Sequence, residues 1–327
     1  MNIYKKIFIS LIVCLTPSLF GKEISVMYYN CWNYFIEKDV KKKKSVESRN
    51  ALADLIVAAN PDILMLCEMG RTESLNDLVD RLKKRKYEVN YSKIMNANDP
   101  SRRLGIISKI KPSAIIEKNN ICYRIRPKNK KYKRTEAYPV LRGFLHSIFK
   151  FDNYKLHIIT AHLKSRLTHY RYSQTDMRRY EARQLRYYVN DLKTLEKDAN
   201  ILIMGDMNDV YSSSPIETIR NEKKGNEKAL FDLKPVDKKG DVWTHWWKTE
   251  DSYSRIDYAF ANFALLPEIN YNKSIIFYDK KKTLIASDHR PLIITIDTKN
   301  KPLLSDNERN KLFSKKCIRN ASSLLAK

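Results

Sequence analysis

The sequence predicts an α/β fold in which mixed β-sheets are covered by helices. Strand-like apolar runs recur from Ile24 to Ile296 and alternate with stretches of helical periodicity. Two of these runs are joined only by Asp152-Asn153, a hairpin signal, so antiparallel strands are expected beside α/β units. This mixture favours sheets packed under helices over one fully parallel sheet. The 327 residues, 43% of them hydrophobic, suffice for one large domain or two small ones.

Apolar residues at helical spacing predict three principal helices. These cover residues 45–59, 72–84 and 177–195. The first ends at Asn60-Pro61, because proline disfavours the helical conformation in the residue before it. The two strands of the hairpin are expected at 141–151 and 154–161. No internal repeat or low-complexity linker divides the chain, so the motifs described next must be brought together by one domain.

Polar residues of the kinds that phosphodiester hydrolysis uses stand at the ends of five predicted strands. Four strands are each followed by such residues: 24–29 by Asn30, 62–67 by Glu68, 156–161 by His162, and 201–205 by Asp206 and Asn208. Asp288 and His289 lead directly into the fifth strand, 292–296. Open sheets bind their ligands at strand ends. The recurrence therefore predicts one functional site at a common edge.

Each residue taken alone also has a structural interpretation. Glu68 suits an ion-paired carboxylate, and His162 suits a core histidine bonded to the backbone. Asp206 and Asn208 are frequent turn formers after a strand, and Asp257 suits an ion pair with its neighbour Arg255. The combination favours function, because acids, two histidines and two asparagines are distributed over six separate strand ends.

Phosphodiester hydrolysis needs this set of side chains. A hard cation such as Mg²⁺ takes oxygen ligands from one or two carboxylates and stabilises charge on the phosphoryl oxygens. A histidine braced by an acid can deprotonate water near neutral pH, and a second histidine can donate to the developing oxyanion. Cys/His spacing typical of zinc is absent from the sequence. Mg²⁺ is therefore the expected cofactor, with Mn²⁺ or Ca²⁺ as alternatives.

The motifs, in their order along the chain, resemble those of the endonuclease/exonuclease/phosphatase superfamily. They are Asn30, Glu68, His162, Gly205-Asp206-Met207-Asn208, Arg255-Ile256-Asp257-Tyr258 and Ser287-Asp288-His289. The resemblance covers the chain from about Ile24 to Ile296. It implies a deoxyribonuclease-like four-layer sandwich, two packed mixed β-sheets flanked by helices, with the site at the common edge of the sheets.

The resemblance also implies a role for each residue of the site. Three residues match the metal ligands: Glu68 as the principal acid, Asn30 beside it, and Asp288 as a further acid. His289 matches the catalytic histidine, and Asp257 the acid that orients it. Asp206 and Asn208 match the pair that positions the nucleophilic water and the phosphate, and His162 matches the histidine that contacts the phosphate.

The expected substrate is DNA or RNA, cleaved by a secreted bacterial nuclease. The formal net charge of +25 favours a polyanionic partner, although a generally lysine-rich surface is an alternative explanation. Lys164 and Arg166 follow His162 and place positive charge beside the site, and a basic aromatic run covers residues 123–134. The family's phosphate-gripping tyrosine or arginine has four candidates here: Arg103, Arg126, Tyr138 and Arg142. Of these, Arg126 and Arg142 are predicted to bind substrate.

Two other interpretations remain. The second interpretation keeps the chemistry but takes a phospholipid or a small phosphoester as substrate, with Trp243, Trp246 and Trp247 available for membrane contact or for core packing. A noncatalytic polyanion-binding module is the third interpretation, against which the full set of motifs argues. The His162-Leu163-Lys164-Ser165 segment and the Gly205–Asp209 segment favour the nuclease.

The N-terminus predicts a cleaved signal peptide at residues 1–21, since Lys5 and Lys6 precede an apolar stretch too short for a membrane span. The catalytic domain is then 22–298, followed by a basic tail at 299–327 with a short helix. We expect a secreted or periplasmic monomer without an integral membrane segment. Cys31 and Cys67 are expected to be buried thiols, with a bridge between them as the alternative.

Overall fold

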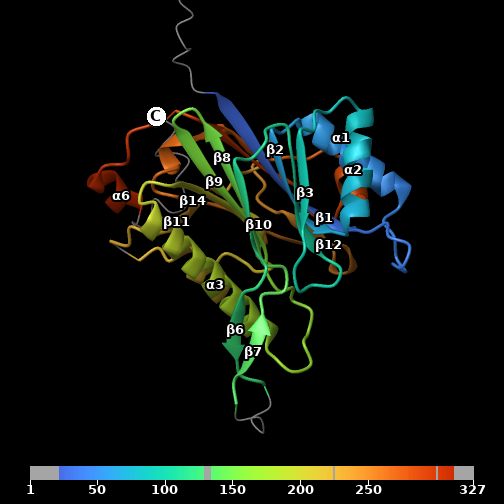
Figure 1. Cartoon of the computed structure of the whole chain (residues 1–327), viewed down its shortest axis with the longest axis horizontal. Coiled ribbons are helices and arrows are strands. Elements are labelled where there is room, and N and C mark those ends of the chain that lie inside the picture. The colour runs from blue at the N-terminus through green and yellow to red at the C-terminus, as the bar shows by residue number, and fades with distance from the viewer. Residues whose placement is uncertain (1–21, 129–133, 224, 300, 313–327) are drawn as a thin grey trace, which may run out of the picture.

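Two six-stranded mixed β-sheets with flanking helices form the protein, as Figure 1 shows. The structure, a computed structural model, describes residues 22–128, 134–223, 225–299 and 301–312. The predicted signal peptide and the end of the tail, residues 313–327, lie outside the described residues. Of the helices in the described part of the chain, none combines the length and the apolar character that a bilayer span requires.

The first sheet has the strand order β15-β16-β1-β2-β4-β3. Its strands, in chain order, are β1 (Glu23–Tyr34), β2 (Ile63–Met69), β3 (Tyr91–Met95), β4 (Arg103–Ser108), β15 (Ile269–Ile276) and β16 (Leu292–Asp297). The neighbours β1 and β2 are parallel, whereas the other pairs are antiparallel.

The second sheet has the order β11-β14-β10-β9-β8-β5. Its strands are β5 (Ala114–Lys118), β8 (Phe144–Phe151), β9 (Tyr154–His162), β10 (Asn200–Asp206), β11 (Leu230–Asp232) and β14 (Asp257–Asn262). Here β9 and β10 are the parallel pair, and the other pairs are antiparallel. Each sheet therefore has one parallel pair near its centre, where the two crossover connections carry the long helices.

The remaining elements are helices and two small hairpins. The helices are α1 (Val46–Ala59), α2 (Thr72–Lys84), α3 (Gln174–Leu195), α4 (Ser214–Arg220), α5 (Thr283–Ala286) and α6 (Asp306–Leu312), with 3-10 turns η1 (Lys248–Glu250) and η2 (Leu266–Glu268). The hairpins are β6 (Cys122–Ile125) with β7 (Glu136–Pro139), which projects from the body, and β12 (His245–Trp247) with β13 (Ser252–Ser254).

Helix boundaries follow from capping and backbone chemistry. Ser45 caps α1 by accepting a hydrogen bond from the Ser48 amide, and the helix ends at Asn60 in the left-handed conformation. Helix α2 has the predicted bounds. Helix α3 begins three residues before the predicted 177, because Ser173 caps it through the Asp176 amide. The hairpin of β8 and β9 turns at Asp152-Asn153 as predicted.

Alternation along the central strands separates three apolar cores. In β1, alternate side chains from Ile24 to Tyr28 lie between the two sheets, while Met27, Tyr29 and Cys31 pack under α1 and α2. A third core joins the outer face of the second sheet to α3 and α4. The order helices, sheet, sheet, helices is the predicted sandwich, and Figure 1 shows α1 and α2 on one side and α3 on the other.

The same alternation places two cysteines in different cores and keeps their thiols apart. Cys67 lies in the core between the sheets, whereas Cys31 lies in the core under α1 and α2. The two thiols therefore lie on opposite faces of the first sheet. Both are free, as is the exposed Cys122, so the alternative of a bridge between Cys31 and Cys67 is not realised. Cys317 falls outside the described residues.

Candidate active site

The two parallel strand pairs bring four of the predicted residues to one edge of the sandwich. Asn30 pairs in register with Cys67, the residue before Glu68, at the carboxyl ends of β1 and β2. Asp206 pairs with His162 at the carboxyl ends of β9 and β10. Because the sheets face each other, these ends meet. The Asn30 Nδ2 atom of the first sheet donates to Asp206 Oδ2 of the second at 3.1 Å.

Antiparallel neighbours add three further residues at the same edge. Asp257 begins β14 and stands opposite Asp206 in the register. Strand β16 runs against β1, so Asp288 and His289, just before its start, arrive beside Asn30. Ser287 fixes this approach: its hydroxyl donates to the Asn30 carbonyl oxygen at 2.8 Å and accepts from the His289 amide at 3.1 Å.

His289 lies at the centre of the cluster and is buried. Its Nδ1 atom is 2.8 Å from Asp257 Oδ2, and its Nε2 atom is 3.3 Å from Asn30 Nδ2. The same Nε2 lies 3.9 Å from carboxylate oxygens of both Asp206 and Asp288. One nitrogen is thus held by an acid, and the other faces the space that the two remaining acids share. Arg255 instead pairs with Asp232, so the alternative of an Arg255–Asp257 ion pair is not realised.

Asp206 is held rigidly by backbone and side-chain donors. Its amide donates to the Tyr28 hydroxyl at 2.7 Å, and its Oδ1 accepts from the Asn208 amide at 2.8 Å. Asn208 adopts a left-handed φ of 53° and donates its side-chain amide to the Leu163 carbonyl oxygen at 3.0 Å. The carboxylate and the turn behind it are therefore set by the meeting of β9 and β10 with Tyr28 of β1.

Glu68 occupies an irregular part of β2. Its φ of 55° is left-handed, and the pairing of β2 with both neighbours shifts around this position. The amide of Asn33 donates to Oε2 at 3.0 Å, and Arg102 Nε lies 3.7 Å from Oε1. Backbone strain of this kind persists where the surrounding structure holds a side chain in a required direction. Here it turns the carboxylate toward the site.

His162 is buried between two acids. Its Nε2 lies 3.8 Å from Glu68 Oε1 and 3.7 Å from Asp206 Oδ2. Burial, followed by the charges of Arg142 and Arg102, lowers the pKa of His162 well below its usual value. The imidazole is therefore neutral and retains one N–H that can donate to a substrate oxygen.

The carboxylates repel one another. Burial and the nearby Glu68 carboxylate together raise the pKa of Asp288 to about 6, against the opposing effect of His289. Burial and the charge of Asp257 likewise raise the pKa of Asp206. Burial alone would lower the pKa of His289, but Asp257, Asp288 and Asp206 outweigh it and raise the pKa to about 10. His289 is thus the cation around which these three carboxylates gather.

This donor set suits a hard divalent cation. Ligand atoms of Asp206, Asp257 and His289 lie within 4.8 Å of one another, and so do those of His245, Asp288 and His289. The Asp257 Oδ1 atom is buried and has no hydrogen-bond partner. Carboxylate oxygens of raised pKa and an orphaned oxygen are what a bound cation would satisfy. Glu68, Asn30 and Asp288 remain the predicted ligands, with Asp206 adjoining them.

The predicted substrate-binding residues fall into different environments. Arg166 lies beside the site, 54% exposed, with Nη2 3.3 Å from Asp209 and Nε donating to the Asn208 carbonyl. Lys164 Nζ is bonded to the Ser165 and Leu167 carbonyls. The buried Arg142 is paired with Asp99 at 2.7 Å and donates to the Leu163 carbonyl, so it braces the segment after His162.

The other phosphate-gripping candidates lie apart from this arrangement. Arg126 is exposed directly after β6 on the projecting hairpin, Arg103 bonds Asn96, and Tyr138 packs among the rings of Tyr123 and Tyr172. None of the hydrogen bonds or ion pairs found among the described residues joins these three side chains to Asp206 or Glu68.

Three charged or titratable residues at the site escaped the sequence reasoning. Lys44 is buried, and burial lowers its pKa to about 8 against the opposing effect of the Asp288 and Glu68 carboxylates. Arg102 faces Glu68. His245 stacks on His289 with ring centroids 4.6 Å apart and has Nε2 3.9 Å from Asp288. In the sequence, Lys44 was marked only by the charge run at 41–44, and His245 only by the aromatic segment at 243–247.

Comparison with known proteins gives a consistent family. The model of the Endonuclease/Exonuclease/phosphatase family matches residues 33–254. The search of curated proteins found no match. Among solved structures, Staphylococcus aureus beta toxin is similar with a TM-score of 0.58 and 14% identity, over 83% of this chain and 99% of that one.

Two other solved structures show the same likeness. An endonuclease/exonuclease/phosphatase family protein from Bacteroides thetaiotaomicron has a TM-score of 0.57 and 12% identity, over 87% of this chain and 99% of that one. Truncated TDP2 from Caenorhabditis elegans has a TM-score of 0.53 and 15% identity, over 84% of this chain and 97% of that one. At these identities the likeness concerns the fold.

Proposed function

The chain belongs to the endonuclease/exonuclease/phosphatase family, and on that premise we propose that it is an exported, divalent-metal-dependent nuclease that hydrolyses phosphodiester bonds of DNA or RNA. Family members are generally hydrolytic phosphoesterases that use divalent metals. The observation that carries the proposal is the His289 imidazole, with Nδ1 2.8 Å from Asp257 and Nε2 facing Asn30, Asp206 and Asp288.

This geometry supports a separate role for each side chain. Asp257 keeps a proton on Nδ1 of His289, so Nε2 is the nitrogen presented to an attacking water. Asn30, which contacts both Nε2 and Asp206, fixes their mutual position. The neutral His162 can donate a hydrogen bond from its N–H to a phosphoryl oxygen without adding a charge that would bind the product too tightly.

Glu68, Asn30 and Asp288 would hold the cation, for which Mg²⁺ is the proposed identity. When bound, it would neutralise the carboxylates that raise the pKa of His289 and stabilise charge on the phosphoryl and leaving oxygens. Asp206 and Asn208 would position the water and the phosphate from the turn after β10. Arg166, in the segment after β9, bonds this turn at Asn208 and Asp209 and is exposed to solvent, where it can bind a phosphate of the substrate backbone.

Nucleic acid is the proposed substrate because the surface near the site is basic. The sequence has 62 Lys+Arg against 37 Asp+Glu, and Lys41, Lys42, Lys43 and Arg102 surround the approach to Glu68. A repeating phosphate backbone uses such a surface more fully than a single phosphoester does.

A phospholipid is the second candidate substrate, and one observation favours it. Trp247 and Tyr253 on the hairpin of β12 and β13 are 56% and 53% exposed. This hairpin is joined to the site, since the Trp246 amide donates to the Asp288 carbonyl at 2.8 Å. Exposed aromatics beside a hydrolytic site suit an interfacial substrate.

A substrate panel separates these candidates. Purified protein would be incubated with plasmid DNA, with RNA and with sphingomyelin vesicles, each with Mg²⁺, Mn²⁺ or Ca²⁺ and with EDTA. We expect cation-dependent cleavage of nucleic acid, and none by Glu68→Gln or His289→Ala. Hydrolysis of the vesicles alone would replace the nuclease proposal with the second candidate. N-terminal sequencing of protein collected outside the cytoplasm would test export, with cleavage near Gly21 as the expected result.

A further inference from the structure

A groove opens beside the candidate active site on the side of β1 and α1. Its volume is about 560 Å³, within the range typical of ligand sites. One wall is the irregular end of β1, with Trp32 and Asn33, and the other is the segment 40–45 before α1. Arg102 closes the end nearest Glu68.

The groove is continuous with the site. Asn33 lines it and donates its amide to Glu68 Oε2 at 3.0 Å. Arg102 lines it and has Nε 3.7 Å from Glu68 Oε1. A ligand whose reacting phosphate lies at Glu68 would therefore extend directly into the groove.

Trp32 is held in a fixed, half-exposed position. The residue is 43% exposed, and it and Asn33 have left-handed φ angles of 47° and 53°. Its amide donates to Asn30 Oδ1 at 3.0 Å, and its carbonyl oxygen accepts from Lys44 Nζ at 3.4 Å. The Lys44 ammonium also lies 5.2 Å from the centre of the indole ring. An indole anchored in this way is a platform on which a planar ring can stack.

The charges lining the groove have one sign. Lys41, Lys42 and Lys43 are exposed, and Lys44 and Arg102 add two further cations, whereas the described lining contains no carboxylate. Of the acids nearby in the chain, Asp39 is paired with Arg71, and Glu37 accepts from Ser74 at 2.8 Å and from the Ile36 amide. Glu47 is exposed in the first turn of α1 and is not part of the lining. This charge favours a polyanion and disfavours a choline headgroup, whose quaternary ammonium the lysines would repel.

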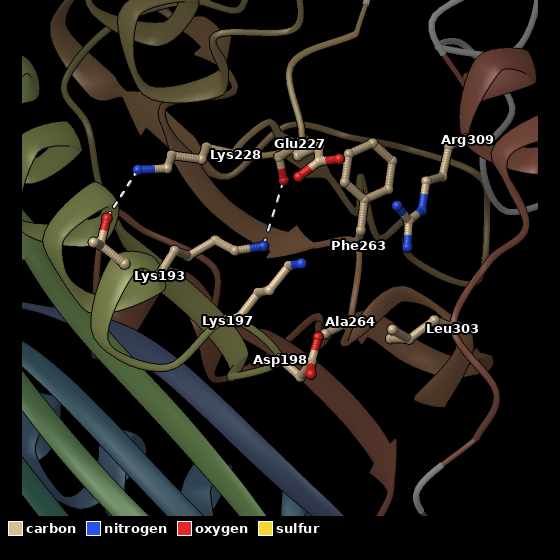
Figure 2. A pocket seen from close by; sticks show the side chains of 10 residues that line it. Lys193, Lys197, Asp198, Glu227, Lys228, Phe263, Ala264, Leu303 and Arg309 are labelled. Carbon is tan, nitrogen blue, oxygen red and sulfur yellow. Dashed lines mark hydrogen bonds between the residues drawn. The ribbon is translucent and has the colours of Figure 1, made fainter.

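A second pocket shows the contrast (Figure 2). It has a volume of about 300 Å³ and includes Lys193, Lys197 and Arg309 together with Asp198 and Glu227. Its charges are mixed, and Asp198 precedes the start of β10, whereas Asp206 stands at the end of that strand. The pocket in Figure 2 therefore lies at the opposite end of β10 from the candidate active site. Unlike the groove, it is lined by charges of both signs.

We propose that the groove binds a single-stranded segment of nucleic acid next to the scissile phosphate, with one base stacked on Trp32 and the flanking phosphates bound by Lys41, Lys42, Lys43 and Arg102. The inference rests on the proposed nuclease function and specifies its substrate as an unpaired strand. Stacking tolerates every base, so the groove selects a flexible polynucleotide and not a sequence.

Binding by a full-length, inactive protein tests the stacking platform. Fluorescence anisotropy of a labelled eight-nucleotide single strand would be measured with His289→Ala in Ca²⁺, alone and combined with Trp32→Ala, Trp32→Phe or the control Tyr187→Ala. Trp32→Ala should weaken binding about 5- to 100-fold, as loss of one stacked base does. Trp32→Phe should recover part of the affinity. Tyr187, 53% exposed on α3, should have no effect.

Salt dependence tests the phosphate contacts. Replacing Lys41, Lys42 and Lys43 together with Gln should lower the slope of log Kd against log salt by about 2, since each phosphate contact to a single strand contributes about 0.7. The matched control replaces Lys83, Lys84 and Lys86 with Gln at the far end of α2, which removes the same charge away from the site. Equal slopes for the two triple variants would overturn the proposed phosphate contacts.

Hydrolysis assays distinguish failure of this inference from failure of the proposed function. Bis(p-nitrophenyl) phosphate lacks a second nucleotide to extend into the groove, so Trp32→Ala with the intact His289 should raise the KM for the single strand far more than the KM for this small substrate. Nuclease activity with unchanged KM in Trp32→Ala would overturn the groove and leave the nuclease standing. Absence of cleavage of any nucleic acid by wild-type protein would overturn the proposed function itself.

Discussion

The Nδ1 atom of His289 lies 2.8 Å from Oδ2 of Asp257, and the two residues belong to different sheets of the sandwich. His289 precedes β16 of the first sheet, and Asp257 begins β14 of the second. Both side chains are buried, so water does not compete with His289 for the Asp257 carboxylate. The orientation of the imidazole is therefore a consequence of how the sheets pack.

Asp257→Asn should reduce kcat on bis(p-nitrophenyl) phosphate by about 10²- to 10⁴-fold, with little change in KM. The asparagine side chain no longer favours the tautomer of His289 that carries its proton on Nδ1. Nε2 would then carry the proton and could not accept one from water. His289→Ala should lose at least as much activity. Steady-state kinetics with thermal melts as a folding control would check this. If His289→Ala melts like wild type and keeps its kcat, His289 has no part in the proposed mechanism.

A divalent cation should stabilise the protein by about 3 kcal/mol at a concentration about 100 times its Kd. Because burial and Glu68 raise the pKa of Asp288 to about 6, Asp288→Asn should raise Tm without cation and abolish the increase with cation. Thermal melts in Mg²⁺, Mn²⁺, Ca²⁺ and EDTA measure both effects. Asp80→Asn, an exposed acid on α2, is the control and should keep the full cation response.

Tyr28→Phe should destabilise the fold by about 1–3 kcal/mol. The Tyr28 hydroxyl accepts the Asp206 amide at 2.7 Å and lies 2.9 Å from Cys67 Sγ, so its removal leaves a buried N–H unsatisfied. Tyr29→Phe is the matched control on the opposite face of β1, since its buried hydroxyl has no partner, and should cost little or stabilise. Urea unfolding compares them. Similar losses in both variants would show that the bond to Asp206 contributes nothing.

Glu181 should make stability depend on pH. Burial raises its pKa from 4.5 to about 7, against the effect of Arg142 and of hydrogen bonds from the Lys164 and Leu141 amides. The folded state thus binds the proton more tightly than the unfolded chain. The stabilising contribution is complete below about pH 4.5 and is lost as pH rises through about 7.

Comparison with Glu181→Gln isolates this contribution, because glutamine does not titrate. Its one oxygen replaces only one of the two carboxylate oxygens that accept from the Leu141 and Lys164 amides, and that loss is the same at every pH. Between pH 5 and pH 8 the free energy of unfolding of wild type should fall relative to the variant, by an amount on the order of 1–3 kcal/mol. Urea unfolding at both pH values gives the difference. A difference that does not change with pH would show that Glu181 stays ionised in the fold.

The sequence predicted the helices 45–59 and 72–84 and the hairpin turn at Asp152-Asn153, because each depends on local signals. Capping, proline and strand alternation act within a few residues. Asn30 and Glu68 could be placed together because carboxyl ends of neighbouring parallel strands share an edge.

What the sequence could not reveal depends on tertiary packing. Lys44 lies in a run of four lysines, and only the turn at Trp32 distinguishes the buried member from its exposed neighbours. Arg142 was expected at a phosphate, but Asp99, 43 residues earlier, engages it. His245 reaches His289 through an isolated bridge between strands that no periodicity marks.

The contribution of both sheets to one site also limits how this molecule can be divided. Asn30, Glu68, Asp288 and His289 come from one half of the sandwich, and His162, Asp206 and Asp257 from the other. Neither half would make a transferable catalytic module, since each carries an incomplete set of groups on an exposed apolar face. Enzymatic turnover in this chain therefore serves as a reporter of complete assembly: it should appear only in the last step of refolding, when the two halves associate.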